Sequence, residues 1–325
     1  MKPTSSTASR WIGIAKVVVL IGIVGWIIAT FPRENWDSLV AQKKNWFLLA
    51  LAFVIVLIAH LISFWRWQIL VRALDVPFRI MEAIRLGFLG TLLNLVSVGS
   101  VGGDVFKAIE AARNAEKKRA EVVASVLVDR AIGLLGLVLV ASISLSFSWS
   151  LSQRLQWIWA GALVLSVVGL LGLFAIVGVG HRIPVRWLTK LPLAGHVSHR
   201  VAHACMIFQG KPRLVLELIG SSMAVHCCFT IGCTLISRAL YVEVPTVAQH
   251  FMTIPPAMAA ATLPLTPGGV GVQEVAIQKL FQEWPDLPPT YSGLIMALVF
   301  RAMLVCVALI GAVYYFAGIG SNTRK

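Results

Sequence analysis

Seven charged residues lie within or beside long apolar stretches of this sequence, where a bilayer would make charge costly. A charged side chain at the bilayer centre costs about 2.5–3.5 kcal/mol on insertion scales, and such groups usually face a cavity or a partner. Arg301 lies deepest, near the middle of the apolar run 291–317. It could bind a phosphate or carboxylate in a wet cavity, or pair with Glu274 or another buried acid, and these two roles are compatible. The seven are Asp104, Lys107, Glu110, Asp129, Arg130, Glu274 and Arg301.

Two of the acids each follow a glycine-rich stretch and open a second short apolar arm. Asp104 ends the stretch 97–104, and Glu274 ends the stretch 264–274. They could make polar contacts at two half-helix starts, or they could be first-turn acids, which the helix dipole favours by about 0.3–1 kcal/mol. Free N–H groups at such breaks suit an anionic phosphate. Lys107, one turn after Asp104, could pair with it or contact a headgroup.

Other polar and small residues near these stretches have two interpretations each. Asn94, in the arm before the first break, could line a cavity or pair with neighbouring backbone. Asp129 and Arg130 begin a long apolar run and could anchor it at the membrane interface. Gly133 and Gly136, a few residues on, are interpreted as sites of close helix packing.

The sequence indicates neither a metal nor a cofactor. His196, His199 and His203 share one helical face, and a His-Cys-Cys group lies at 226–228, but neither has the spacing of a closed zinc site. No GxxxxGK[ST], GxSxG, HExxH or CxxC motif occurs. We therefore expect no cofactor, no metal and no P-loop for ATP-driven transport.

The composition of the 325 residues excludes a soluble enzyme, a disordered chain and a secreted disulfide scaffold. Hydrophobic residues make up 58% and charged residues 13%, with a mean hydropathy of +0.83. Soluble domains are about half apolar and about a quarter charged. The net charge of +14 would suggest nucleic acid in a soluble protein. In a membrane protein it indicates cytoplasmic loops and anionic lipid headgroups instead.

Apolar runs of about 20 residues predict an all-α, polytopic transmembrane bundle, because only helices satisfy their own backbone in lipid. Segments 80–113 and 246–284 are each interrupted by glycine or proline. Irregular backbone at membrane depth must line a cavity or be buried in protein, so both are predicted to be broken or re-entrant helices. The six predicted full spans are 11–31, 46–64, 121–149, 156–180, 214–238 and 290–317.

The distribution of lysine and arginine predicts the orientation. The segments that would share one side carry 18 of these residues, and those on the other side carry 4, which places both termini in the cytoplasm. The first broken segment would then be entered from the cytoplasmic side and the second from the outer side. With their similar glycine patterns, this suggests an inverted repeat. Within a single membrane domain, 1–325, residues 181–213 are predicted to form an amphipathic basic connector at the inner interface.

Several of these elements together resemble the transmembrane region of the lysylphosphatidylglycerol synthase family, also called the flippase-like domain. They are Asn94, Gly102-Gly-Asp104-Val-Phe-Lys107, Asp129-Arg130-Ala-Ile-Gly133, Pro267-Gly-Gly-Val-Gly271-Val-Gln-Glu274 and Arg301. The resemblance covers about residues 11–318 and implies a bundle that moves a lipid between leaflets. Larger relatives carry a soluble transferase domain, and only eight residues follow Ala317 here. Aminoacyl transfer is therefore not expected, and Gln273, where relatives often have a basic residue, bears on the preferred headgroup charge.

The favoured hypothesis is a stand-alone translocator of an anionic or modified phospholipid, or of a lipid-linked headgroup, in the bacterial inner membrane. The two breaks would form one polar cavity near the midplane. Two alternatives stay open: a non-catalytic partner of a lipid- or envelope-synthesis enzyme, and a membrane transferase with Asp104 or Glu274 as base. Membrane lipids are the expected partners, and nucleic acid is not. The predicted binding set is Asn94, Gly102, Gly103, Asp104, Lys107, Arg130, Pro267, Gly268, Gly269, Gly271, Glu274 and Arg301.

Overall fold

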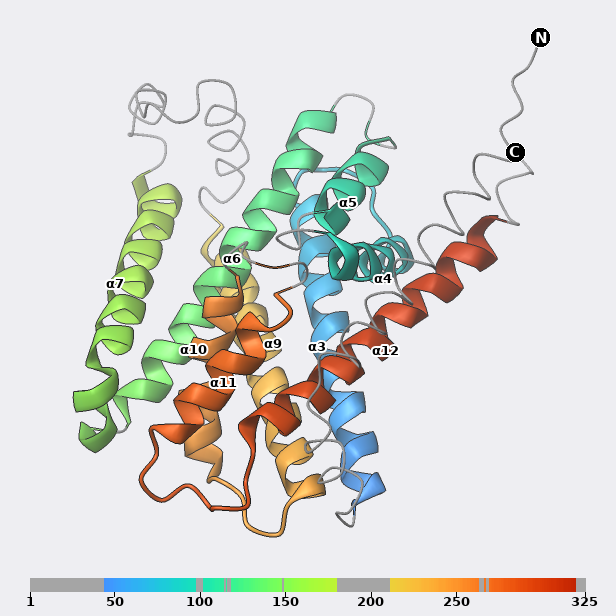
Figure 1. Ribbon diagram of the computed structural model, residues 1–325. Coiled ribbons are helices and arrows are strands. Elements are labelled where there is room, and N and C mark those ends of the chain that lie inside the picture. Colours follow the sequence, from blue (N-terminus) through green and yellow to red (C-terminus); the bar gives the residue numbers. More distant parts are fainter. Residues whose placement is uncertain are drawn as a thin grey trace. The chain divides into compact units, whose positions relative to one another are not determined.

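All regular structure in the described part of the chain is helical, which confirms the all-α prediction (Figure 1). This computed structural model describes residues 44–97, 102–113, 115, 118–147, 149–179, 211–262, 266 and 269–319, and only the backbone of 96, 149–155, 174–179 and 314–319. The helices are α3 (Trp46–Arg72), α4 (Ile80–Val96), α5 (Gly102–Arg113), α6 (Arg119–Ser146), α7 (Trp149–Val179), α9 (Pro212–Leu240), α10 (Val247–Ala261), α11 (Val272–Gln282) and α12 (Gly293–Ile319).

Five of these helices, α3, α6, α7, α9 and α12, are long and apolar enough to cross a membrane. They correspond to five of the six predicted spans, and the sixth, 11–31, lies outside the described residues, as does most of the predicted connector 181–213. One predicted boundary is wrong: α3 runs to Arg72 instead of ending at residue 64. The helix continues because Trp67, Leu70 and Val71 are buried against other helices beyond the apolar run.

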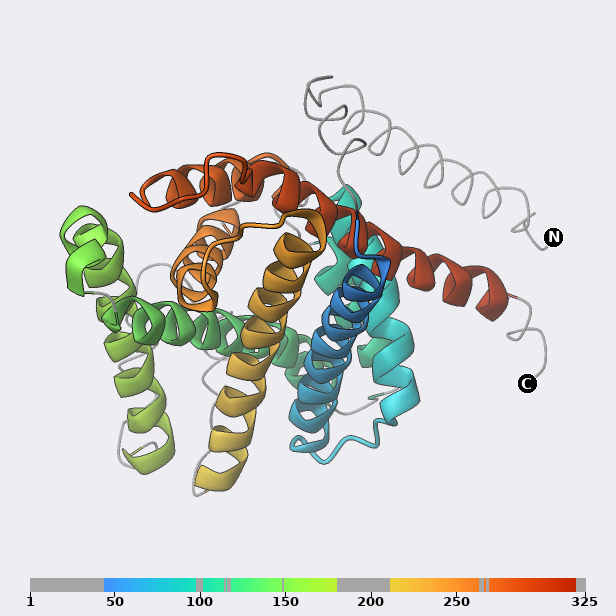
Figure 2. The same cartoon turned by 90° about the horizontal axis from the view of Figure 1, so that it is seen from below.

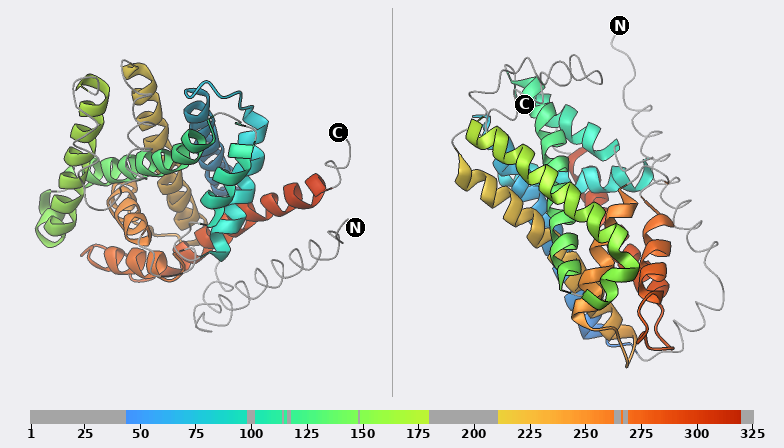
Figure 3. Two further views of the ribbon diagram at one scale, coloured as in Figure 1. Left: turned by 90° about the horizontal axis from the view of Figure 1, so that it is seen from above. Right: turned by 90° about the vertical axis from the view of Figure 1, so that its left-hand side faces the viewer.

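Each broken segment is a pair of short helices that pack against each other, α4 with α5 and α10 with α11 (Figure 3). The first pair makes a close backbone approach, since a Cβ added at Gly103 would lie 1.9 Å from the carbonyl oxygen of Gly90. The second break instead uses glycine conformation: Gly269 and Gly271 have φ of +68° and +85°. Glycine adopts such angles readily because it has no Cβ.

The helices α3–α6 and α9–α12 repeat one order, in which two short helices stand between two long ones. The long helices α3 and α9 pack along each other, as Figure 2 shows. The short helix α4 packs on α12, and its counterpart α10 packs on α6. Because α3 and α9 run in opposite directions in Figure 1, the two helix pairs begin at opposite ends of the bundle. This is the arrangement of an inverted repeat, with α7 packed on α6 outside it.

A buried apolar cluster fixes α5 against α3, α4 and α6. Its members include Trp67, Phe78, Ala83, Ala108 and Val122, all less than a tenth exposed. The Trp67 ring meets the Phe78 ring edge to face, with centroids 5.0 Å apart. The small alanines of α5 allow it to lie close to its neighbours, and this rigid packing positions the start of α5 beside α6.

Candidate functional site

A cavity of about 510 Å³ is bordered by α3, α4, α5 and α6, by α9 and by Thr262 at the end of α10. It is named the first-half cavity because its charged lining residues come from α3, α5 and α6. Its lining combines two kinds of side chain. The charged ones are Arg66, Asp104, Lys107, Asp129 and Arg130, and the apolar ones include Phe64, Leu134, Leu137, Val225 and Phe229. Such a lining suits an amphiphilic molecule better than a purely polar or purely apolar one.

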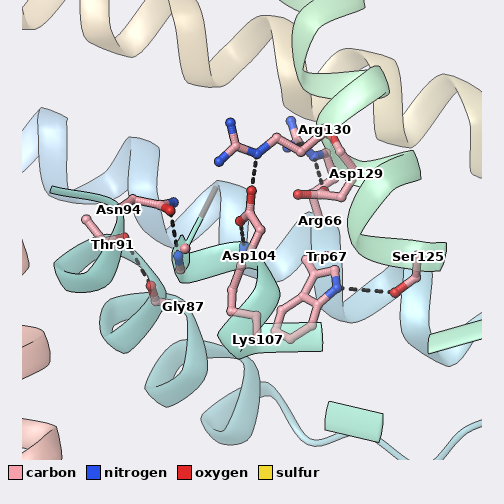
Figure 4. Close-up of polar contacts among 12 residues, drawn as sticks. Arg66, Trp67, Gly87, Thr91, Asn94, Asp104, Lys107, Ser125, Asp129 and Arg130 are labelled. Carbon is pink, nitrogen blue, oxygen red and sulfur yellow. Dashed lines mark hydrogen bonds and ion pairs between the residues drawn. The ribbon is translucent and has the colours of Figure 1, made fainter. Parts of the chain in front are cut away.

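Asp104, in the first turn of α5, pairs with two cations (Figure 4). One carboxylate oxygen lies 3.1 Å from Lys107 Nζ, and the other accepts a hydrogen bond from Arg130 Nε on α6. The Asp104 side chain is only 11% exposed, whereas that of Arg130 is 47% exposed. Arg130 is therefore the charged group of this pair that a molecule in the cavity can reach.

Lys107 is more deeply buried than Arg130. Its Nζ lies 5.2 Å from the centroid of the Trp67 ring, within the range of a cation–π contact, and its side chain is 13% exposed. Of the two roles predicted for Lys107, the salt bridge to Asp104 is present. Its place between that carboxylate and Trp67 makes Lys107 a residue that positions Asp104.

The backbone of the first break is held by side chains of α4. The N–H of Gly103 donates to Asn94 Oδ1 at 2.8 Å, and the N–H of Gly102 donates to Ser97 Oγ at 3.0 Å. The expectation that these N–H groups would be free for a phosphate is therefore wrong, because α4 supplies their acceptors. Asn94 fixes the start of α5 and also lines the cavity, so its two predicted roles are combined.

A second ion pair lines the same cavity, and the sequence-based prediction missed one of its members. Arg66 Nε donates to Asp129 Oδ1 at 2.8 Å, and both residues are buried. Asp129 therefore does not anchor α6 at the interface, as one interpretation held, because it faces α3 inside the bundle. The guanidinium of Arg66 lies against Gly133, where a Cβ would come within 3.4 Å of Arg66 Nη2.

Helix α9 closes the cavity against α6 through polar contacts to the α6 backbone. Ser222 Oγ donates to the carbonyl oxygen of Ile132 at 3.0 Å, and His226 Nε2 donates to that of Gly133 at 3.1 Å. A Cβ added at Gly136 would lie 2.1 Å from Ser222 Oγ, so the close packing predicted there is present.

The second break holds a similar ion pair that is closed off. Arg301 Nε donates to Glu274 Oε1 at 2.7 Å, and each side chain is 5% exposed. Arg301 Nη2 also donates to the carbonyl oxygen of Gly269 at 3.3 Å and to Gln273 Oε1 at 3.1 Å. The other Glu274 oxygen accepts from the N–H of Gly271 at 2.7 Å. The ion pair that the sequence predicted for Arg301 is thus present, and it clamps the start of α11.

The predicted binding set is consequently divided between two places rather than joined in one cavity. Asn94, Asp104, Lys107 and Arg130 line the first-half cavity, whereas Glu274 and Arg301 are not among its described lining residues. Gly102 and Gly103 lie in the first turn of α5, and Gly269 and Gly271 precede α11. Pro267 and Gly268 lie outside the described residues. Glu110, another candidate, pairs with the exposed Arg113 at 2.7 Å, away from the cavity lining.

Comparison with known families gives one match. The model of the family described as "Lysylphosphatidylglycerol synthase TM region" matches residues 13–311, nearly the whole chain. The chain belongs to this family. Comparisons with curated proteins and with solved structures gave no match. Membership makes this a multi-pass membrane protein of lipid or envelope biosynthesis or transport.

Proposed function

We propose that the protein moves a phosphate-bearing lipid between the leaflets of the bacterial inner membrane, with the headgroup in the first-half cavity. The observation that carries this proposal is the half-exposed Arg130, which is held by Asp104 and lines a cavity that also has apolar walls. An arginine in such a place binds phosphate oxygens through several N–H groups at once. Family membership supports the same direction.

In this mechanism the residues of the chain have separate tasks. Arg130 contacts the phosphate, while Lys107 and Asn94 keep Asp104 and the start of α5 in place. The apolar wall, to which Phe229 and Leu137 belong, allows the adjoining glycerol and acyl segments to stay out of water. The proposal includes no covalent step, and movement would be downhill or coupled to an ion.

We further place both chain termini in the cytoplasm. The ends of α3, α7 and α12 and the starts of α6 and α9 share one end of the bundle in Figure 1. Basic residues lie at this end, among them Arg72, Arg113, Lys118, Arg119 and Lys211. Positively charged loops favour the cytoplasmic side.

The test is transbilayer exchange of fluorescent phospholipids in vesicles that contain the purified protein. The wild-type protein is expected to exchange labelled phosphatidylglycerol faster than empty vesicles do. Arg130→Gln should slow this exchange by about tenfold or more, because a hydrogen bond to a charged group contributes about 1.5–3 kcal/mol. Arg113→Gln is the matched control, since it removes the same charge from an exposed helix end that does not line the cavity. Wild-type exchange no faster than in empty vesicles, over several headgroups, would contradict the proposal.

A further inference from the structure

Two aromatic rings connect the wall of the first-half cavity to the helix that carries Arg301. Phe229 of α9 is one of the lining residues. Its ring meets the ring of Phe300 on α12 edge to face, with centroids 5.8 Å apart. Phe300 is only 1% exposed and directly precedes Arg301, whose guanidinium binds the second break. The two rings therefore lie between the cavity and the turn of α12 that carries Arg301.

The same cavity reaches the start of the second break. Thr262, at the end of α10, is exposed and lines the cavity. Within the break, Thr266 Oγ1 and Gln273 Nε2 are buried, and neither has a hydrogen-bond partner among the described residues. Buried polar atoms are nearly always paired in folded proteins, so each of these two would gain a partner if water or a polar group entered. The closed break therefore lacks hydrogen bonds that an opened one would have.

We infer that Phe229 and Phe300 form a gate, which keeps the first-half cavity apart from the second break and opens when a lipid passes. The inference rests on the proposed function, because a lipid that crosses the membrane must pass from one half of an inverted repeat to the other. The rings close this route because they fill space and offer no hydrogen-bonding group to water or a headgroup. Ring contact favours the closed arrangement, and the unpartnered polar atoms of the break favour the open one. Their balance sets the fraction of molecules in which the route is open.

The first test is the direction in which lipid exchange changes when a ring is removed. Phe229→Ala loses the ring contact of the closed arrangement only, and it should speed exchange of labelled phospholipid about tenfold. Phe300→Ala should act in the same direction. Phe88→Ala is the matched control, since it removes a buried ring that meets Phe64 at 5.0 Å and is not among the described lining residues. This control should lower stability in detergent without speeding exchange. Exchange by Phe229→Ala that is no faster than that of the wild type would overturn the gate and leave translocation standing.

A second measurement examines the gate without lipid exchange. Thr266→Cys replaces the buried hydroxyl by a thiol, and its modification by a charged maleimide is followed at that site by mass spectrometry of the purified protein in detergent. Adding Phe229→Ala should raise the modification rate about tenfold, whereas adding Phe88→Ala should not change it. Phe229→Leu keeps most of the side-chain volume and should give a smaller increase, which tests the gate if the alanine variant does not fold. Equal rates with and without these Phe229 substitutions would overturn the gate. A wild type that exchanges no lipid would contradict the proposed function, and faster modification would then still support a gate between the cavity and the second break.

Discussion

The two halves of the molecule hold the same ion pair in opposite surroundings. In each half the third residue of the second short helix is an acid, Asp104 or Glu274, and it accepts from the Nε of an arginine on the last long helix. The side chain of Arg130, which lines the cavity, is 47% exposed, whereas that of Arg301 is 5% exposed. The same acid–arginine pair in an inverted repeat thus has two roles. In the first half it borders an accessible cavity, and in the second it is buried and holds the start of α11.

Neighbouring residues explain why the second pair is closed. Arg301 has additional acceptors in Gly269 and Gln273, which fold over the guanidinium. The residue that precedes Arg130 is the charged Asp129, while the residue that precedes Arg301 is Phe300, which is 1% exposed. The Phe300 ring meets the Phe229 ring of α9 edge to face, with centroids 5.8 Å apart.

The largest effect on folding is expected at the sealed pair. Arg301→Gln leaves Glu274 as a buried carboxylate without its cation, and breaking a buried ion pair in this way destabilises a protein by about 3–5 kcal/mol. The measurement is denaturant or thermal unfolding of the purified protein in detergent. The double variant Glu274→Gln/Arg301→Gln should recover part of the loss, because no lone charge remains. A single variant as stable as the wild type would mean that the clamp does not hold the second break.

An intermediate effect is expected where the first break depends on close packing. A Cβ at Gly103 would overlap the carbonyl oxygen of Gly90, so Gly103→Ala must push α5 away from α4. Overpacking of this kind costs about 1–3 kcal/mol, and here it also displaces Asp104 from Arg130. Both unfolding and lipid exchange should report it. Gly161→Ala is the control, since a Cβ there meets no atom within 4 Å, and it should leave both unchanged.

Much of this arrangement could be predicted from the sequence, because long apolar runs and glycine-rich interruptions act locally. The five long helices and both broken segments follow from such patterns. Arg66 was missed because the apolar run of α3 ends before it, although the helix continues to Arg72. The repeating positions of Trp67, Leu70 and Val71 could have shown this continuation.

The division of the predicted site could not be predicted in the same way. Glu274 and Asp104 look alike in sequence, because each follows glycines and opens a short helix. Which of them borders a cavity depends on packing between distant helices and on side chains such as Phe300 and Arg66. Sequence periodicity predicts which side chains share one face of a helix. Only the packed structure shows which residues that face contacts.

The smallest effect on folding is expected at the Asp104–Arg130 pair. Its variant therefore gives the clearest contrast with the buried Glu274–Arg301 pair. Arg130→Gln removes a guanidinium that is nearly half exposed, and Asp104 keeps Lys107 as its partner. Solvent screening limits the contribution of such a pair to about 1 kcal/mol or less. Unfolding in detergent should therefore change little, while lipid exchange falls. If Arg130→Gln destabilised the protein as much as Arg301→Gln does, both pairs would be structural clamps. The first-half cavity would then lose the accessible cation on which its proposed role depends.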